Sequence, residues 1–145
     1  MSWAGKKSFK DLFKSLFPQR EQALSSLDAA LPHGEEAYLE ARLQKWVQAK
    51  GYRLPHRTLV EAAESIGTSY PILYRYFSAD GKDFRTWRTA LRLQDAMEQM
   101  KAEPDTPLST ISRRVGFSDR SNFARLFKEH MGLTPHQWRK SNNNF

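Results

Sequence analysis

The sequence predicts an all-α fold with two helix-turn-helix subdomains, a long helix that joins them, and an extra helical segment at the N-terminus. Apolar residues recur at spacings of three and four along most of the chain, as on the buried face of a helix. Gly67 and Gly116 interrupt this spacing, and each is soon followed by a polar residue that can cap a new helix. A helix, a glycine corner and a second helix therefore occur twice.

The composition excludes several classes of protein. The 145 residues fit one domain, or one small domain with an appendage. The absence of cysteine excludes a disulfide framework, a thiolate metal site and a thiol nucleophile. No apolar run is long enough for a transmembrane segment, and the N-terminus lacks the apolar region of a secretion signal. We therefore expect a soluble, cytoplasmic protein.

The net charge of +7 is concentrated near the C-terminus. Residues 106–145 hold seven basic and two acidic side chains, whereas residues 35–105 hold eleven of each. Five of the seven excess charges therefore lie in one stretch, as expected of a surface that binds phosphate groups. The alternative is a solvated basic face that maintains solubility.

Residues 1–34 are predicted to be an amphipathic helical extension followed by a linker. Within residues 3–17 an apolar stripe lies opposite four lysines, and it consists of Phe9, Leu12, Phe13, Leu16 and Phe17. Such a helix can lie on an anionic membrane, bind a protein partner, pair two chains or pack on its own domain. A second short helix, near residues 21–31, precedes the linker Pro32-His33-Gly34.

The main domain is predicted over residues 35–141, and residues 142–145 form a tail. Its first helix ends at Lys50, where Gly51 is the expected cap. The longest helix, about residues 84–101, joins the two helix-turn-helix subdomains and should fix the distance between them.

The first helix-turn-helix is predicted at about residues 58–78. Thr58 and Glu61 form a capping box for its first helix, and Ser69 can cap its second. The outward side chains of that second helix are predicted to be Tyr70, Tyr74 and Arg75.

The second helix-turn-helix is predicted at about residues 108–130. Ser109 is placed to cap its first helix, and Gly116 turns the chain. Either Ser118 or Asp119 can cap the second helix, which buries Phe123, Leu126 and Phe127. The residues left on its outward side are Arg120, Ser121, Asn122 and Arg125.

This second subdomain is similar to the C-terminal signature of the AraC/XylS family of bacterial transcription regulators. The residues that match at the family's spacing are Ile111, Gly116-Phe117-Ser118, Phe123, Arg125, Phe127-Lys128, Gly132, Thr134-Pro135 and Trp138-Arg139. Ser112 replaces the usual alanine, while Arg92 stands where the family has a characteristic arginine. The first subdomain resembles the family's N-terminal helix-turn-helix more loosely, because the loop after it is shorter and Pro71 replaces a residue that often reaches DNA.

The resemblance implies a regulator that binds double-stranded promoter or operator DNA and activates or represses transcription, with RNA polymerase as a partner. It also implies two recognition helices that enter successive major-groove segments, roughly 34 Å apart on one face of DNA. One monomer would then read both segments without needing to dimerise. We expect the protein to be associated with the nucleoid.

Seven residues are predicted to contact base edges, namely Arg120, Ser121, Asn122, Arg125, Tyr70, Tyr74 and Arg75, since arginine can pair with guanine and asparagine with adenine. Five are predicted to contact phosphates, which position a protein on DNA, namely Ser69, Lys128, Thr134, Arg139 and Lys140. Tyr74 can instead pack at the edge of the core, and Arg125 can instead make a contact within the domain or with a phosphate.

No pattern in the sequence points to catalysis or to a metal. His130 and His136 flank the turn at Gly132, but no carboxylate cluster joins them to complete a metal site. There is no nucleophile–base pair, paired-carboxylate site or glycine-rich phosphate loop. We expect neither an enzyme nor a bound cofactor.

Two other functions remain open at this point. The chain can be an interaction or antagonist module in which the amphipathic helix at residues 3–17 binds a protein or a membrane while DNA reading is weakened. It can also be a replication or mobile-element factor that binds DNA.

Overall fold

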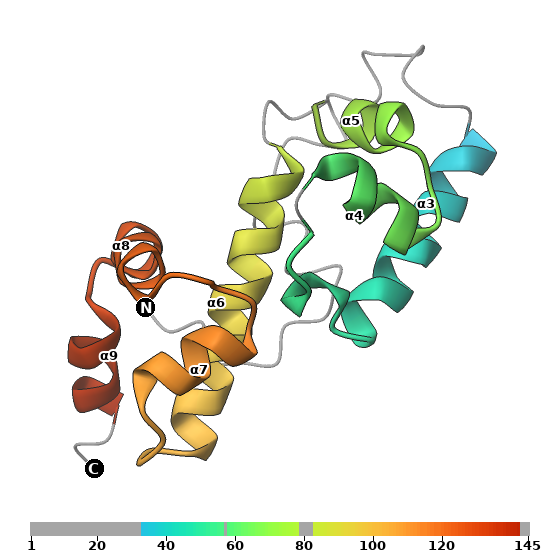
Figure 1. The fold of residues 1–145 in the computed structure, drawn as a ribbon. Helices are drawn as coiled ribbons and strands as arrows, with labels where there is room; N and C mark the ends of the chain where they lie inside the picture. Colours follow the sequence, from blue (N-terminus) through green and yellow to red (C-terminus); the bar gives the residue numbers. More distant parts are fainter. Residues whose placement is uncertain (1–32, 57, 79–82, 143–145) are drawn as a thin grey trace. The chain divides into compact units, whose positions relative to one another are not determined.

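The structure is a computed structural model that describes residues 33–56, 58–78 and 83–142. Every regular element in these ranges is helical, which confirms the all-α prediction. The α-helices in Figure 1 are α3 (His33–Gln48), α4 (Leu59–Ile66), α5 (Tyr70–Ser78), α6 (Phe84–Ala102), α7 (Leu108–Arg114), α8 (Arg120–Met131) and α9 (Pro135–Asn142), and a short 3₁₀ helix η1 (Gly51–Arg53) follows α3.

The predicted N-terminal extension lies outside the described residues, apart from the last part of its linker. There the prediction is wrong, because His33 and Gly34 belong to α3. The described residues form two compact units, one made of residues 33–51 and 56–87 and the other of residues 52–55 and 88–142. The helix α6 begins in the first unit and continues into the second.

An aromatic cluster forms the core of the first unit. The Trp46 ring centroid lies 5.6 Å from that of Phe84 and 6.1 Å from that of Trp87, and Phe77 lies 5.1 Å from Trp87. These four side chains come from α3, α5 and the start of α6, so they hold the three helices together by burying large apolar surfaces.

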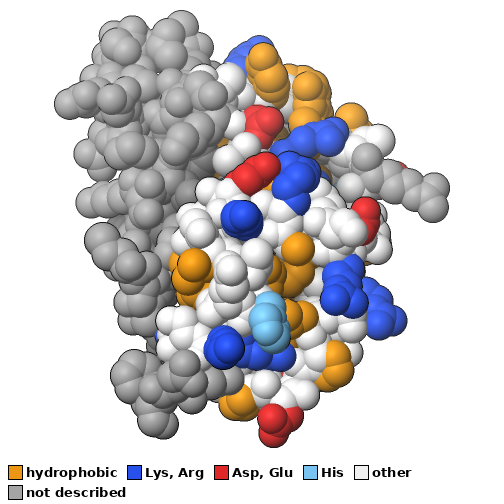
Figure 2. Space-filling view, turned by 90° about the vertical axis from the view of Figure 1, so that its left-hand side faces the viewer, with side chains coloured by type: hydrophobic (Ala, Val, Ile, Leu, Met, Phe, Trp, Pro, Cys, Tyr) orange, Lys and Arg blue, Asp and Glu red, His pale blue; other side chains and the backbone are white. Residues whose placement is uncertain are grey.

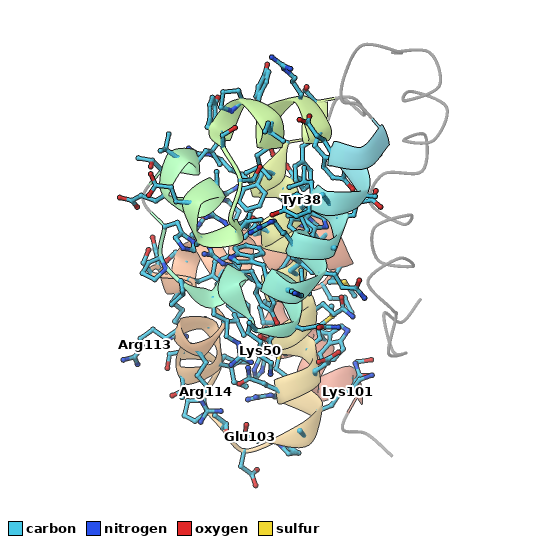
Figure 3. The ribbon with its side chains drawn as sticks, turned by 90° about the vertical axis from the view of Figure 1, so that its right-hand side faces the viewer. Tyr38, Lys50, Lys101, Glu103, Arg113 and Arg114 are labelled. Carbon is cyan, nitrogen blue, oxygen red and sulfur yellow. The ribbon has the colours of Figure 1, made fainter. Side chains whose placement is uncertain are left out.

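The predicted glycine cap of α3 is wrong by one residue. Lys50, with φ of 59°, adopts the left-handed conformation that ends the helix, and Gly51 begins η1 instead. Gly51 is buried, and a Cβ atom at this position would collide with the indole ring of Trp46. Glycine is therefore needed here for space and not for its backbone angle. Figure 3 labels Lys50 and, on α3, Tyr38, whose hydroxyl accepts a hydrogen bond from Arg42.

The first helix-turn-helix begins and turns where the sequence predicts. The Thr58 hydroxyl accepts a hydrogen bond from the backbone N–H of Glu61 at 3.1 Å, which confirms Thr58 as the N-cap of α4. Gly67 ends α4 in the left-handed conformation with φ of 93°. The helix α5 then starts directly after Ser69.

The second unit has its own aromatic core. The ring centroids of Phe117 and Phe123 lie 5.2 Å apart, those of Phe123 and Phe127 lie 5.8 Å apart, and Phe127 lies 6.0 Å from Trp138 of α9. All four side chains are buried, so α8 is fixed between the turn that precedes it and α9. Leu126, predicted to be buried with Phe123 and Phe127, is only half-buried.

Ser109 does not cap α7, contrary to prediction. The helix starts at Leu108, two residues earlier than a cap at Ser109 implies, and Pro107 occupies the N-cap position without a side-chain hydrogen bond. Proline has no side-chain acceptor, so the first N–H groups of α7 receive no side-chain cap from this position. Inside the helix the Ser109 carbonyl accepts a hydrogen bond from the hydroxyl of the buried Ser112 at 3.0 Å.

The segment of residues 52–55 is fastened to α6 by buried polar contacts. The Asp95 carboxylate accepts hydrogen bonds from the Tyr52 hydroxyl at 2.9 Å and from Arg53, where Nε is 2.5 Å and Nη2 is 2.8 Å away. Burial and the Asp95 charge raise the pKa of the Tyr52 hydroxyl, which therefore stays protonated and donates. We refer to these contacts of Asp95, together with the contacts of Arg92 described next, as the α6 clamp.

Arg92 completes the α6 clamp from the neighbouring turn of the helix. Its Nε donates to the Tyr52 carbonyl at 2.6 Å and its Nη2 donates to the Leu54 carbonyl at 3.1 Å. Burial, with a smaller effect of the Arg88 charge, lowers the pKa of Arg92 to about 10, so the side chain remains charged at neutral pH. The guanidinium also lies 5.8 Å from the Phe117 ring centroid, which connects the clamp to the turn before α8.

Candidate nucleic-acid interface

The start and orientation of α8 follow from three local features. Gly116 adopts φ of 112°, a left-handed value that an L-residue with a side chain rarely takes. Phe117 then turns inward, and the Asp119 carboxylate accepts a hydrogen bond from the Ser121 N–H at 2.8 Å as the N-cap of α8. The sequence left both Ser118 and Asp119 open as caps, and the structure shows that Asp119 is the cap. Because Phe123 and Phe127 are buried, the opposite side of α8 must face solvent.

The four base-contact candidates on α8 lie on that exposed side. Arg120, Ser121, Asn122 and Arg125 are all exposed, and the first three occupy the first turn of the helix. Within the described part of the chain, Arg120 makes no hydrogen bond or ion pair with another side chain. Its guanidinium donors are therefore available to an acceptor outside the protein.

Arg125 is held by two neighbours on α8. Its Nη2 donates to the Asn122 Oδ1 at 2.7 Å, and its Nη1 pairs with the Glu129 carboxylate at 2.9 Å. Both members of the ion pair are more than half exposed, so the pair contributes only about 0.3–0.5 kcal/mol. Such weak contacts can be exchanged for contacts with DNA, and bidentate pairing of Asn122 with adenine would use the Oδ1 atom that now accepts from Arg125.

The phosphate candidates of the second unit surround α8 and α9. Lys128 and Lys140 are exposed, and each lies in the last turn of its helix. Thr134 caps α9, because its hydroxyl accepts from the Gln137 N–H at 3.1 Å while the Gln137 Oε1 accepts from the Thr134 N–H at 3.0 Å. In Figure 2, Lys and Arg side chains are exposed at several places, and acidic side chains lie beside some of them.

Arg139 differs from the other phosphate candidates. It is half-buried, and its Nε and Nη2 atoms are covered without an acceptor among the described residues. A covered guanidinium N–H is unfavourable unless an acceptor reaches it. Helical spacing predicts that Trp138 faces the core. It does not indicate that the neighbouring Arg139 side chain is also partly covered.

Two further arginines, on α7, were not among the predicted site residues. Arg113 is exposed and projects away from α7 into solvent, whereas the Arg114 Nη1 lies 2.8 Å from the Glu103 Oε2 (Figure 3). The sequence signal was available, because the two arginines are consecutive and lie just before the Gly116 turn. They contribute to the basic excess of the second unit.

The base-contact candidates of the first unit are also exposed. Tyr70, Tyr74 and Arg75 point outward from α5, and Ser69, the phosphate candidate, is exposed just before it. The exposed fractions of Tyr70 and Tyr74 are 38% and 59%, and their ring centroids lie 6.0 Å apart. More than half of Tyr74 is exposed, which argues against the alternative that it packs at the edge of the core.

Neither metal binding nor membrane insertion is indicated by the described residues. No group of three or more potential metal ligands occurs among their side chains. None of the helices in the described ranges is long and apolar enough to cross a membrane. The apolar stripe at residues 3–17, on which the interaction and membrane alternatives depend, lies outside these ranges.

The family described as a helix-turn-helix domain matches residues 62–141. YesN of Bacillus subtilis, an uncharacterized transcriptional regulatory protein, is 39% identical over 61 residues, which are 41% of this chain and 17% of YesN. The transcriptional activator NphR of a Rhodococcus species is 32% identical over 83 residues, or 57% of this chain and 24% of NphR. The transcriptional activator RhrA of Rhizobium meliloti is 25% identical over 130 residues, which are 88% of this chain and 40% of RhrA.

These similarities cover only part of each relative. The chain spans less than half the length of the curated proteins that it matches. No solved structure matches the chain significantly.

Proposed function

Because the chain belongs to the AraC/XylS family of helix-turn-helix transcription regulators, we propose that it binds specific sites in double-stranded DNA at promoters or operators and regulates transcription there. The proposed DNA-binding domain spans residues 35–141. Each helix-turn-helix inserts its second helix, α5 or α8, into one of two successive major-groove segments. Activation is the proposed direction of regulation, since two relatives are described as transcriptional activators.

The observation that carries this proposal is the exposed polar face of α8. Arg120, Ser121 and Asn122 occupy the first turn of a helix whose opposite face is fixed by buried phenylalanines. Guanidinium, hydroxyl and carboxamide groups are the side chains that pair with base edges in the major groove. The basic excess around them supplies the phosphate contacts that any DNA complex needs. RNA polymerase is the proposed partner, and the nucleoid the proposed location.

The role of Arg120 can be tested by selecting bound sequences from a random duplex pool. We expect the full chain to select a motif of two blocks about one helical turn apart. Arg120→Ala should relax the sequence of one block and weaken binding to the original motif by about 2 kcal/mol, the size of one lost bidentate pair. The other block should keep its sequence.

Arg113→Ala is the matched control, because it removes one exposed arginine from the same unit but not from α8. It should leave the selected sequence unchanged and at most weaken binding to all sequences alike, with a shallower salt dependence. A pool without any enriched motif for the full chain, with weak salt-sensitive binding only, would overturn specific regulation and favour the interaction-module alternative.

A further inference from the structure

The outward surface of α5 differs chemically from that of α8. Each helix has two buried residues four positions apart, Leu73 and Phe77 in α5 and Phe123 and Phe127 in α8, and all four are at most 1% exposed. Aligning the helices on these residues matches Leu73 with Phe123 and Phe77 with Phe127. This pairing also brings Arg75 into register with Arg125. The helices therefore start at equivalent positions, and their outward residues can be compared one by one.

Side chains with a large apolar surface occupy the start of α5, two of them at the positions where α8 has the polar donors Arg120 and Ser121. Tyr70 takes the position of Arg120, Pro71 that of Ser121, and Tyr74 that of Ala124. Proline has no side-chain donor or acceptor, and the two tyrosine rings form a continuous exposed aromatic surface. The exposed surfaces of these three side chains adjoin at the start of α5, so they can together contact a partner that presents an apolar group.

The major groove offers one apolar group, the C5-methyl of thymine. Resting on the proposed DNA-binding function, we propose that α5 recognises thymine methyl groups through Tyr70, Pro71 and Tyr74, whereas α8 reads hydrogen-bonding edges. Arg75, exposed beside Tyr74, adds a charged contact to a base edge or a phosphate. The DNA block bound by α5 is then rich in thymine at fixed positions, and its recognition requires the methyl groups themselves.

Deoxyuridine provides a direct probe, because it pairs as thymine does but lacks the C5-methyl group. The probe is a two-block duplex from the selection, and the block of α5 is the one whose sequence survives Arg120→Ala. Replacing its thymines by deoxyuridine should reduce the affinity of the full chain about fourfold for each contacted methyl, as for one buried methylene.

Two variants assign this effect to the tyrosine rings. The double variant Tyr70→Ala/Tyr74→Ala should bind the thymine duplex more weakly than the unmodified chain does. Its affinities for the thymine and deoxyuridine duplexes should be equal, since the methyl groups have lost their partners. Tyr70→Phe/Tyr74→Phe keeps both rings and should retain the fourfold effect. Both tyrosines are exposed, so the variants should unfold at the temperature of the unmodified chain, which a thermal melt verifies.

The failures of the two proposals are distinguishable. A two-block motif that tolerates deoxyuridine, or loss of discrimination in the phenylalanine variant, overturns methyl reading while leaving specific DNA binding intact. A motif with only the Arg120 block shows that α5 reads no bases and also overturns the inference. The absence of any motif removes the proposed function itself, and the inference with it.

Discussion

Replacing Asp95 by alanine is expected to lower the free energy of unfolding by about 3 kcal/mol, as for other broken buried ion pairs. The Asp95 side chain is 5% exposed and accepts hydrogen bonds from Tyr52, Arg53 and Gln99. Without the carboxylate, the buried Tyr52 hydroxyl loses its acceptor and Arg53, at 29% exposure, is only partly rehydrated. Unfolding of both proteins in urea measures the difference.

Glu103→Ala provides the control, because Glu103 is also a carboxylate paired with an arginine. Its partner Arg114 is 2.8 Å away, but the two side chains are 45% and 43% exposed. Water replaces the lost contact at such positions, so the expected change is below about 1 kcal/mol. Equal losses for the two variants would contradict a stabilising role of burial in the α6 clamp.

The α6 clamp should also make stability depend on pH. Burial alone would raise the pKa of Asp95, but the hydrogen bonds from Arg53, Gln99 and Tyr52 outweigh it and hold the pKa below its ordinary value. The stabilisation is therefore complete above the unfolded pKa of about 3.9 and is lost as the pH falls through the lower folded value. Below about pH 4 the free energy of unfolding should consequently fall more steeply for the unmodified chain than for Asp95→Asn.

Much of the fold was predictable because its signals are local. The cap at Thr58 and the left-handed turns at Gly67 and Gly116 each depend on a few consecutive residues. The helices between them follow from apolar spacing alone. Two of the errors, at Gly51 and Ser109, concern the residue at which a helix ends or starts, and in both cases a neighbouring residue takes the expected position.

The α6 clamp could not be predicted, because it joins residues about forty positions apart. Neither periodicity nor capping indicates that Asp95 and Arg53 meet, although a charged residue on the buried face of a helix does indicate that a partner is required. The resemblance marked the position of Arg92 but not its acceptors, the carbonyls of Tyr52 and Leu54.

The candidate interface was only partly predictable, for a similar reason. Helical spacing correctly left the α8 candidates outward, since it follows from the burial of Phe123 and Phe127. Spacing does not reveal that Asn122 and Arg125 are bonded to each other, or that Arg139 is half-buried. Those properties depend on rotamers and packing, which a one-dimensional pattern does not contain.

Gly116→Ala is expected to lower the free energy of unfolding by about 3 kcal/mol, the sum of backbone strain and steric overlap. The strain arises from φ of 112° at this position. The overlap arises because a Cβ atom would lie 2.7 Å from the Arg53 carbonyl oxygen and 2.7 Å from the Arg92 Nε. Since the carbonyl belongs to the backbone, either the α6 clamp or the turn that positions α8 must shift.

Gly132→Ala separates the two contributions. Gly132 also has a positive φ, 77°, but a Cβ atom added there would meet nothing within 4 Å, so only the strain of about 1 kcal/mol should appear. Thermal and urea unfolding of the two variants give the comparison. Because the Gly116 turn orients α8, Gly116→Ala should also weaken binding to the α8 block of the DNA site more than Gly132→Ala does. Equal destabilisation by the two substitutions would show that the contacts of Gly116 with Arg53 and Arg92 do not fix this turn.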